Sequence, residues 1–210
     1  DAYDIGGFAI VDDNFVVAKD KVRDICTQIA DLHLRWSALS RVDTVDAQLL
    51  KDMANSGCIE VKFGVESGSE TMLRAMRKNT TREKITRAVE WAHDAGIEAK
   101  AFIIHGYPGE DRRTTEETID LLDQLSGKLS RVSLFRFVPL PGTQVYEQVN
   151  GSGRRIKGTH LGPDWDGDWE KFHIHHNDRH WWGTDADFEE LQMAYRDLEM
   201  FVESRWGRQK

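Results

Sequence analysis

Cysteine, proline and long apolar runs are scarce in this sequence. Its 210 residues include two cysteines and four prolines, and no apolar run approaches the ~20 residues that a membrane-spanning helix needs. Two cysteines cannot form a disulfide framework, so a reducing cytoplasm is the expected compartment. Cys26 and Cys58 also lie too far apart in sequence for a zinc or iron–sulfur motif, and we expect both to be small buried hydrophobic residues.

Basic residues are outnumbered by acidic ones. The 28 basic and 36 acidic side chains give a net charge of -8, which argues against a nucleic-acid-binding protein, because such proteins usually present a basic face. Apolar residues make up 40% and charged residues 30%, as in ordinary globular proteins. The length suits one domain, with or without an appendage. Since a strand is expected almost directly after Asp1, we expect a natural chain that continues upstream.

The sequence does contain a regular alternation of apolar strands and amphipathic helices. Capping-box patterns at Thr80–Glu83 and Thr114–Glu117 predict two of the helix starts. This alternation predicts a parallel sheet with right-handed crossovers, in either a doubly wound sheet or a barrel. The strands are expected at 7–11, 34–39, 59–65, 97–105 and 131–138.

Polar residues gather where the predicted strands end, which is where both of these folds bind ligands. Small polar residues also favour ordinary turns, but Arg41 and Glu66 are not turn formers. Arg41 could hold a carboxylate in a fork, and Glu66 could accept hydrogen bonds from ribose hydroxyls or an ammonium group. The alternative is that Arg41 and Glu66 pair with each other as a structural ion pair.

The character of the chain changes beyond Val149. Residues 160–182 contain five of the eight histidines and four of the seven tryptophans, and a helix is predicted after Thr184. The histidines at 173, 175, 176 and 180 could suggest a metal site, but their spacing fits neither one strand face nor one helix face. We therefore favour an aromatic-rich packing layer or lid.

Five segments of the chain are FAIVDDNF at 8–15, RVD at 41–43, FGVESGS at 63–69, GYPGE at 106–110 and PLPGT at 139–143. In this order and spacing they resemble the radical S-adenosylmethionine superfamily, and within it the cobalamin-binding class. That class includes radical methyltransferases and the anaerobic magnesium-protoporphyrin ester cyclase. The resemblance covers about residues 5 to 150 and implies an α/β fold: a partial TIM-like (β/α)6 barrel with strands 2–6 present, over residues 1–149, and a C-terminal Trp/His-rich helical cap over residues 150–210.

The resemblance also implies that S-adenosylmethionine lies across the strand ends. It singles out no catalytic residue and no metal ligand in this chain. By matching position, the cofactor-binding residues are Asp12, Asp13 and Asn14 near the methionine part, Arg41 at the next strand end, Glu66 and Ser67 facing ribose or the methionine part, and Gly106, Tyr107 and Pro108 beside the adenine.

Two parts of the family pattern do not occur in these residues. The CxxxCxxC loop that holds a [4Fe–4S] cluster is missing, as is the cobalamin-binding domain. We expect both in upstream segments of the same protein, and we do not expect this chain alone to be active. The resemblance implies part of a radical enzyme, most simply a cobalamin-dependent methyltransferase that acts on an unactivated carbon through a 5′-deoxyadenosyl radical. Alternatives are an oxidative cyclase, or a non-catalytic partial barrel that binds a ligand or a partner.

The substrate is expected to be a small molecule. Lys62, His105 and Arg136 would favour an anionic group, such as a phosphonate, if they line the barrel mouth. A shift of one residue in the strand phase would turn all three away.

Overall fold

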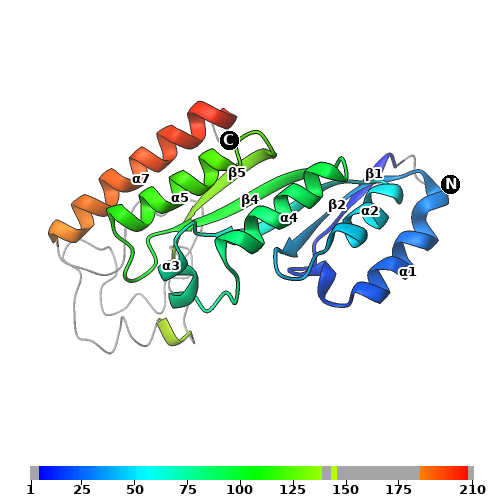
Figure 1. The fold of residues 1–210 in the computed structure, drawn as a ribbon, viewed down its shortest axis with the longest axis horizontal. Helices are drawn as coiled ribbons and strands as arrows, with labels where there is room; N and C mark the ends of the chain where they lie inside the picture. The colour runs from blue at the N-terminus through cyan, green and yellow to red at the C-terminus, as the bar shows by residue number, and fades with distance from the viewer. Residues whose placement is uncertain (1–4, 139–142, 146–184, 208–210) are drawn as a thin grey trace.

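The computed structural model describes residues 5–138, 143–145 and 185–207, and these residues build one parallel sheet covered by helices (Figure 1). The five strands lie in the order β1-β2-β3-β4-β5, and every neighbouring pair is parallel. The strands are β1 (Gly7–Ile10), β2 (Arg35–Arg41), β3 (Cys58–Glu66), β4 (Glu98–His105) and β5 (Leu129–Arg136).

Because the strand order follows the chain order, right-handed crossovers place the helices on one face of the sheet. In a doubly wound sheet the strand order reverses at a switch point, and the order here does not reverse. The sheet is therefore the wall of a partial, unclosed barrel. The helical elements are η1 (Phe15–Val17), α1 (Lys19–Ile29), η2 (Ala30–Leu32), α2 (Ala47–Asn55), α3 (Glu70–Ala75), α4 (Arg82–Asp94), α5 (Arg112–Gln124) and α7 (Asp185–Trp206).

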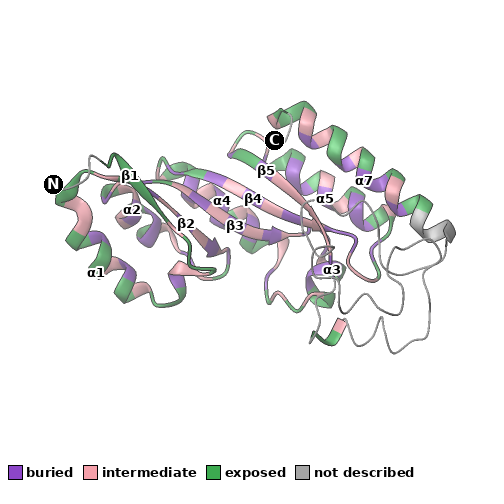
Figure 2. Cartoon of the chain, turned by 180° about the vertical axis from the view of Figure 1, so that it is seen from behind, coloured by how far each residue is buried: buried purple, intermediate pink, exposed green. Residues whose placement is uncertain are grey.

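The central strands β2, β3 and β4 alternate between a buried and a less buried face, as the view from behind shows (Figure 2). In β4, Ala99, Ala101 and Ile103 are at most 1% exposed beneath the helices, while Lys100 and Phe102 point to the opposite, concave face. The helix-facing side chains form a continuous core between sheet and helices. This packing leaves the concave face free to carry polar residues.

Two predicted helix starts need correction. Thr81, not Thr80, caps α4, with its side chain accepting a hydrogen bond from the Lys84 amide at 3.3 Å. The capping box of α5 is Asp111 with Thr114 instead of Thr114 with Glu117, because the Asp111 carboxylate accepts from the Thr114 amide at 2.8 Å. Thr80 is instead buried at the cavity wall, and Thr114 is the N3 residue of the box, where its hydroxyl accepts from the Asp111 amide at 2.9 Å.

The C-terminal helix α7 packs against α5 and β5 and so extends the helix layer (Figure 1). Leu198 and Val202 are fully buried, and the Trp206 indole donates to the Leu129 carbonyl at 3.0 Å. The predicted boundary near residue 150, the Trp/His-rich cap and the histidines 173–180 lie outside the described residues. Among the described helices, none combines the length and apolar character that crossing a membrane requires.

Candidate functional site

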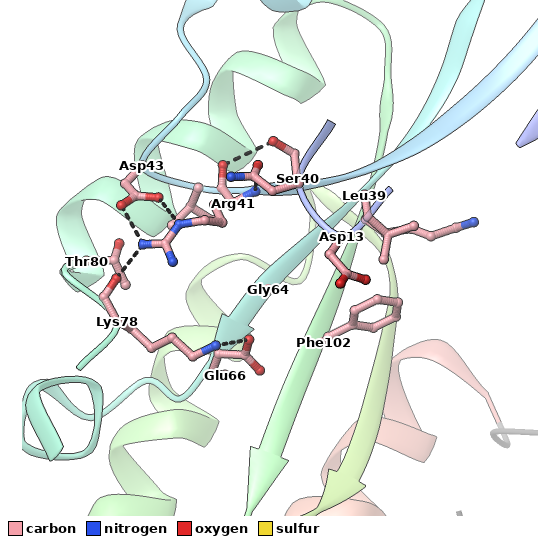
Figure 3. Close-up of a pocket in the computed structure, with 13 residues that line it drawn as sticks. Asp13, Leu39, Ser40, Arg41, Asp43, Gly64, Glu66, Lys78, Thr80 and Phe102 are labelled. Atoms are coloured by element: carbon pink, nitrogen blue, oxygen red, sulfur yellow. Dashed lines mark hydrogen bonds and ion pairs between the residues drawn. The ribbon is translucent and has the colours of Figure 1, made fainter. Parts of the chain in front are cut away.

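A cavity of about 350 Å³ opens at the carboxyl ends of the first four strands (Figure 3). Charged side chains from three strand ends and from the loop after α3 surround it. This is the end of the sheet at which parallel α/β folds bind ligands. The lining residues are Asp13, Asn14, Leu39, Ser40, Arg41, Val42, Asp43, Lys62, Gly64, Glu66, Lys78, Thr80 and Phe102.

Arg41 forms the predicted fork, but with a carboxylate two residues further along the chain. Its Nε and Nη2 donate to the Asp43 carboxylate oxygens at 2.8 and 2.7 Å. Nη2 also donates to the Lys78 carbonyl at 2.9 Å. The hydrogen bonds from Arg41 hold the pKa of Asp43 below its usual value. The alternative of a structural Arg41–Glu66 pair is therefore wrong.

Glu66 reaches the cavity through an unusual backbone conformation. Its φ is 68°, in the left-handed region, at a register shift between β3 and β4. Its carboxylate accepts a hydrogen bond from the Lys78 ammonium at 2.8 Å, and the side chain is only 12% exposed. A Cβ on Gly64 would lie 2.8 Å from the Glu66 carboxylate, so glycine leaves the room that this side chain occupies. Left-handed non-glycine residues cluster at functional sites.

Asp43, Lys78 and Thr80 are among the lining residues for which the sequence predicted no binding role. Lys78 lies between Arg77 and Asn79, which both have positive φ, and this tight turn carries the lysine back over the strand ends. The Thr80 hydroxyl is buried at the cavity wall without a hydrogen-bond partner among the described residues. The sequence does show a lysine, Lys78, in the short polar loop between α3 and α4. The direction in which its side chain points depends on the geometry of the turn.

The end of β1 contributes two of its three predicted residues. Asp13 and Asn14 line the cavity, and the Asn14 side-chain oxygen accepts from the Arg41 amide at 3.3 Å. Asp12 does not line it; its carboxylate accepts from the Asn14 amide at 2.9 Å and stabilises the turn. Asp13 and Asn14 thus line the same cavity as Arg41 and Glu66.

Ser67 points away from the cavity, toward α5. Its hydroxyl lies 3.2 Å from the Thr118 hydroxyl and accepts from the Ser69 amide at 3.1 Å, and the residue is fully buried. The Gly68 amide donates to the same Thr118 hydroxyl at 2.9 Å. In this structure Ser67 anchors the β3–α3 loop, and its role toward a cofactor stays a prediction.

Gly106, Tyr107 and Pro108 follow β4 at the same end of the sheet without lining the cavity. Gly106 has a φ of 91° and donates its amide to the buried Glu110 carboxylate. The Tyr107 ring packs edge-on against Phe137 with centroids 4.8 Å apart. Burial raises the pKa of Glu110 to about 7, against the backbone hydrogen bonds that lower it. The buried Glu110 and the packing of Tyr107 therefore hold the backbone of residues 106–108 in place.

The cavity presents both signs of charge to a ligand. Asp13 and the Glu66 carboxylate can accept hydrogen bonds from ammonium or hydroxyl groups, while Lys78 can pair with a carboxylate. The Thr80 hydroxyl adds a polar atom that a ligand could satisfy. The chemistry therefore suits a zwitterionic, hydroxyl-bearing molecule, which fits the amino-acid and ribose parts of S-adenosylmethionine.

An iron–sulfur cluster does not fit the described residues. They contain no group of three His, Cys, Asp or Glu side chains that could hold a metal ion. Both cysteines are buried at 4% exposure in the core. Burial raises the pKa of the Cys26 thiol, and it raises that of Cys58 to about 12. Thiols in this state are structural and not metal ligands.

Comparison with known proteins identifies the family. The Radical SAM superfamily profile matches residues 5–122. The chain belongs to the radical S-adenosylmethionine superfamily. Members of this superfamily use S-adenosylmethionine together with a [4Fe–4S] cluster, so the predicted family and cofactors are confirmed at that level.

Relatives in the superfamily are much longer than this chain. An uncharacterised methyltransferase of Pyrococcus horikoshii is 33% identical over 69% of this chain and 32% of its own length. The anaerobic magnesium-protoporphyrin IX monomethyl ester cyclase of Rubrivivax gelatinosus is 26% identical over 70% of this chain and 27% of its own length. The chain spans no more than about a third of these relatives.

A solved structure of the same superfamily supports the fold. The radical S-adenosylmethionine methyltransferase TsrM from Kitasatospora setae, with cobalamin and [4Fe-4S] cluster bound, matches with a TM-score of 0.56 at 22% identity. The match covers 67% of this chain and 29% of that chain. At this identity the likeness establishes the partial-barrel fold and nothing finer.

Proposed function

We propose that this radical S-adenosylmethionine chain is the cofactor-cavity part of a cobalamin-dependent methyltransferase that methylates an unactivated carbon of a small molecule. The observation that carries the proposal is the cavity in which Glu66 and Lys78 meet at the strand ends. Relatives named as a methyltransferase and a cyclase support this class of enzyme.

Under this proposal, the charged residues of the cavity and the segment after β4 hold S-adenosylmethionine. The Glu66 carboxylate accepts hydrogen bonds from the ribose hydroxyls, and the Lys78 ammonium pairs with the methionine carboxylate. Asp13 and Asn14 accept hydrogen bonds from the methionine ammonium. Arg41 acts through position, since it is fixed by Asp43 and holds the Lys78 backbone. The 106–108 segment offers backbone groups to the adenine.

The proposal places the remaining cofactors outside the described residues. A [4Fe–4S] cluster, when bound, supplies the electron that cleaves S-adenosylmethionine; its ligands, and the cobalamin-binding domain, belong to upstream segments of the same cytoplasmic protein. Within this chain we assign residues 1–149 to the barrel and 150–210 to a cap. What the described residues do themselves is bind and orient S-adenosylmethionine.

The test uses the full-length protein, reconstituted anaerobically with iron and sulfide, with and without cobalamin. S-adenosylmethionine carrying a labelled methyl group is added with a strong reductant and candidate small molecules. The proposal expects 5′-deoxyadenosine, and labelled methyl in the product only when cobalamin is present. Deoxyadenosine with an unlabelled, ring-closed product would replace methyl transfer by the cyclase alternative. A protein that binds no iron and yields no deoxyadenosine would contradict both.

A further inference from the structure

Two lysines face each other in the middle of the concave sheet face. Lys62 of β3 and Lys100 of β4 are direct register partners, and neighbouring strands lie only ~5 Å apart. Both are on the face away from the helices, and both are partly buried. Like charges placed directly across two strands destabilise a sheet. Such a pair is expected where it serves a ligand.

The two lysines differ in how their charge is balanced. The Lys62 ammonium lies 3.3 Å from the Glu60 carboxylate and lines the cavity. Lys100 has no carboxylate within ion-pair distance among the described residues, and its ammonium lies over the Phe102 ring, 5.2 Å from the centroid. Phe102 is itself part of the cavity wall. Lys100 therefore presents, beside the cavity, a cation that forms no ion pair among the described residues.

The neighbouring charges add to the positive charge around Lys100. Its register partner on β5 is Arg131, so three basic residues lie side by side across β3, β4 and β5. Glu60 is the acidic group that acts on Lys100, and it already pairs with Lys62. Burial and the charges of Arg131 and Lys62 lower the pKa of Lys100, and Glu60 opposes them. An anion between Lys62 and Lys100 would offset the cost of burying the two ammonium charges, and it would reduce the repulsion between them.

Resting on the proposed function, we propose that Lys62 and Lys100 bind a phosphate- or phosphonate-type group of the substrate on the concave face, next to the S-adenosylmethionine cavity. A group with two negative charges matches two ammonium groups, and lysine binds such groups as a point charge. The enzyme's substrates would then be small molecules that carry this oxyanion.

The test is a calorimetric titration of the chain with methylphosphonate at constant ionic strength, paired with thermal unfolding. We expect one binding site, and about tenfold weaker binding in Lys100→Met. We also expect the unfolding temperature of Lys100→Met to rise by about 2 °C, because the substitution removes a partly buried charge that lies in register with two other basic residues. Lys51→Met, on the exposed surface of α2, should change neither quantity.

Other results would overturn the proposal. These are no binding of methylphosphonate, equal affinity in Lys100→Met, a lower unfolding temperature in that variant, or loss of binding in Lys78→Met alone. A parallel titration with S-adenosylmethionine separates the two proposals. If S-adenosylmethionine binds and methylphosphonate does not, only the oxyanion site is wrong; in the reverse case, the S-adenosylmethionine cavity is wrong.

Discussion

Glu66 combines backbone strain, burial and an ion pair in one cavity residue. It ends β3 in a left-handed conformation, with a largely buried carboxylate paired to Lys78. The strained backbone costs on the order of 1 kcal/mol or more, and glycine at this position would remove that strain. The proposed hydrogen bonds from ribose hydroxyls would give the Glu66 carboxylate a use that offsets this strain.

Glu110 leads to a prediction about pH. Its pKa rises from 4.5 to about 7 in the folded chain because the carboxyl is buried. Between these values the folded chain keeps a proton that the unfolded chain has lost. Stability is therefore fully present below pH 4.5 and falls by roughly 3 kcal/mol as the pH rises to 7. Urea unfolding at a series of pH values measures this decline.

Glu110→Gln is the matched variant for that measurement. Its side-chain oxygen can still accept the hydrogen bond from Gly106, but the group no longer titrates. The decline in stability between pH 4.5 and 7 should be smaller by that amount. An equal decline in both proteins would show that another group is responsible.

At the scale of single residues, the sequence predicted part of the cavity. Arg41 and Glu66 could be identified because neither residue type favours the turns in which they occur. Asp43 and Lys78 could not, since their positions depend on the fork to Arg41 and on the tight turn around Lys78. Lys100 was also missed, because its role depends on strand register and on which face each residue occupies.

At the scale of elements, the close approach of the β3–α3 loop to α5 depends on Gly68. A Cβ at this position would lie 2.5 Å from the Thr118 Cα and 2.6 Å from the Glu117 carbonyl oxygen. Gly68→Ala should destabilise the chain by about 1–3 kcal/mol, because two backbone segments must move apart. The midpoint of urea unfolding measures this change.

Gly127→Ala is the control for Gly68→Ala. A Cβ on Gly127 would meet no heavy atom within 4 Å, so its midpoint should stay close to that of the parent chain. Similar losses in both variants would mean that the packing of Gly68 against α5 is not what stabilises the loop.

The elements themselves were largely predictable. All five strands occur within a few residues of the predicted ranges, because apolar strands between amphipathic helices form a strong pattern. The register shifts at Trp36, Gly64 and Ala99 could not be predicted, since they arise from the fit between neighbouring strands. The shift at Gly64 lies directly before Glu66, the β3 residue whose φ is 68° and whose side chain lines the cavity.

At the scale of the whole molecule, α7 joins the far end of the chain to the barrel wall. Leu198 is fully buried against the core, and Arg112 of α5 pairs with Asp197 at 2.9 Å on the surface. An exposed pair of this kind contributes little, so burial of the apolar face stabilises the docking. The sequence predicted a helix after Thr184, but not that it packs against α5 and β5.

Leu198→Ala should therefore lower the free energy of unfolding by about 2–5 kcal/mol. Met200, two residues further along α7, is 61% exposed, and Met200→Ala should be close to neutral. Chemical denaturation of the two variants side by side measures the difference. A near-neutral Leu198→Ala would mean that α7 adds nothing to the stability of the barrel wall.

The central claim is that the cavity around Glu66 and Lys78 binds S-adenosylmethionine. The most direct measurement is an NMR titration of the ¹⁵N-labelled chain with S-adenosylmethionine. We expect saturable shifts in the amides of Arg41, Glu66 and Lys78. We also expect about tenfold weaker binding in Glu66→Gln and no change in Glu83→Gln, an exposed glutamate that pairs with Arg87 on α4. Shifts elsewhere in the chain, or equal affinity in Glu66→Gln, would contradict the central claim.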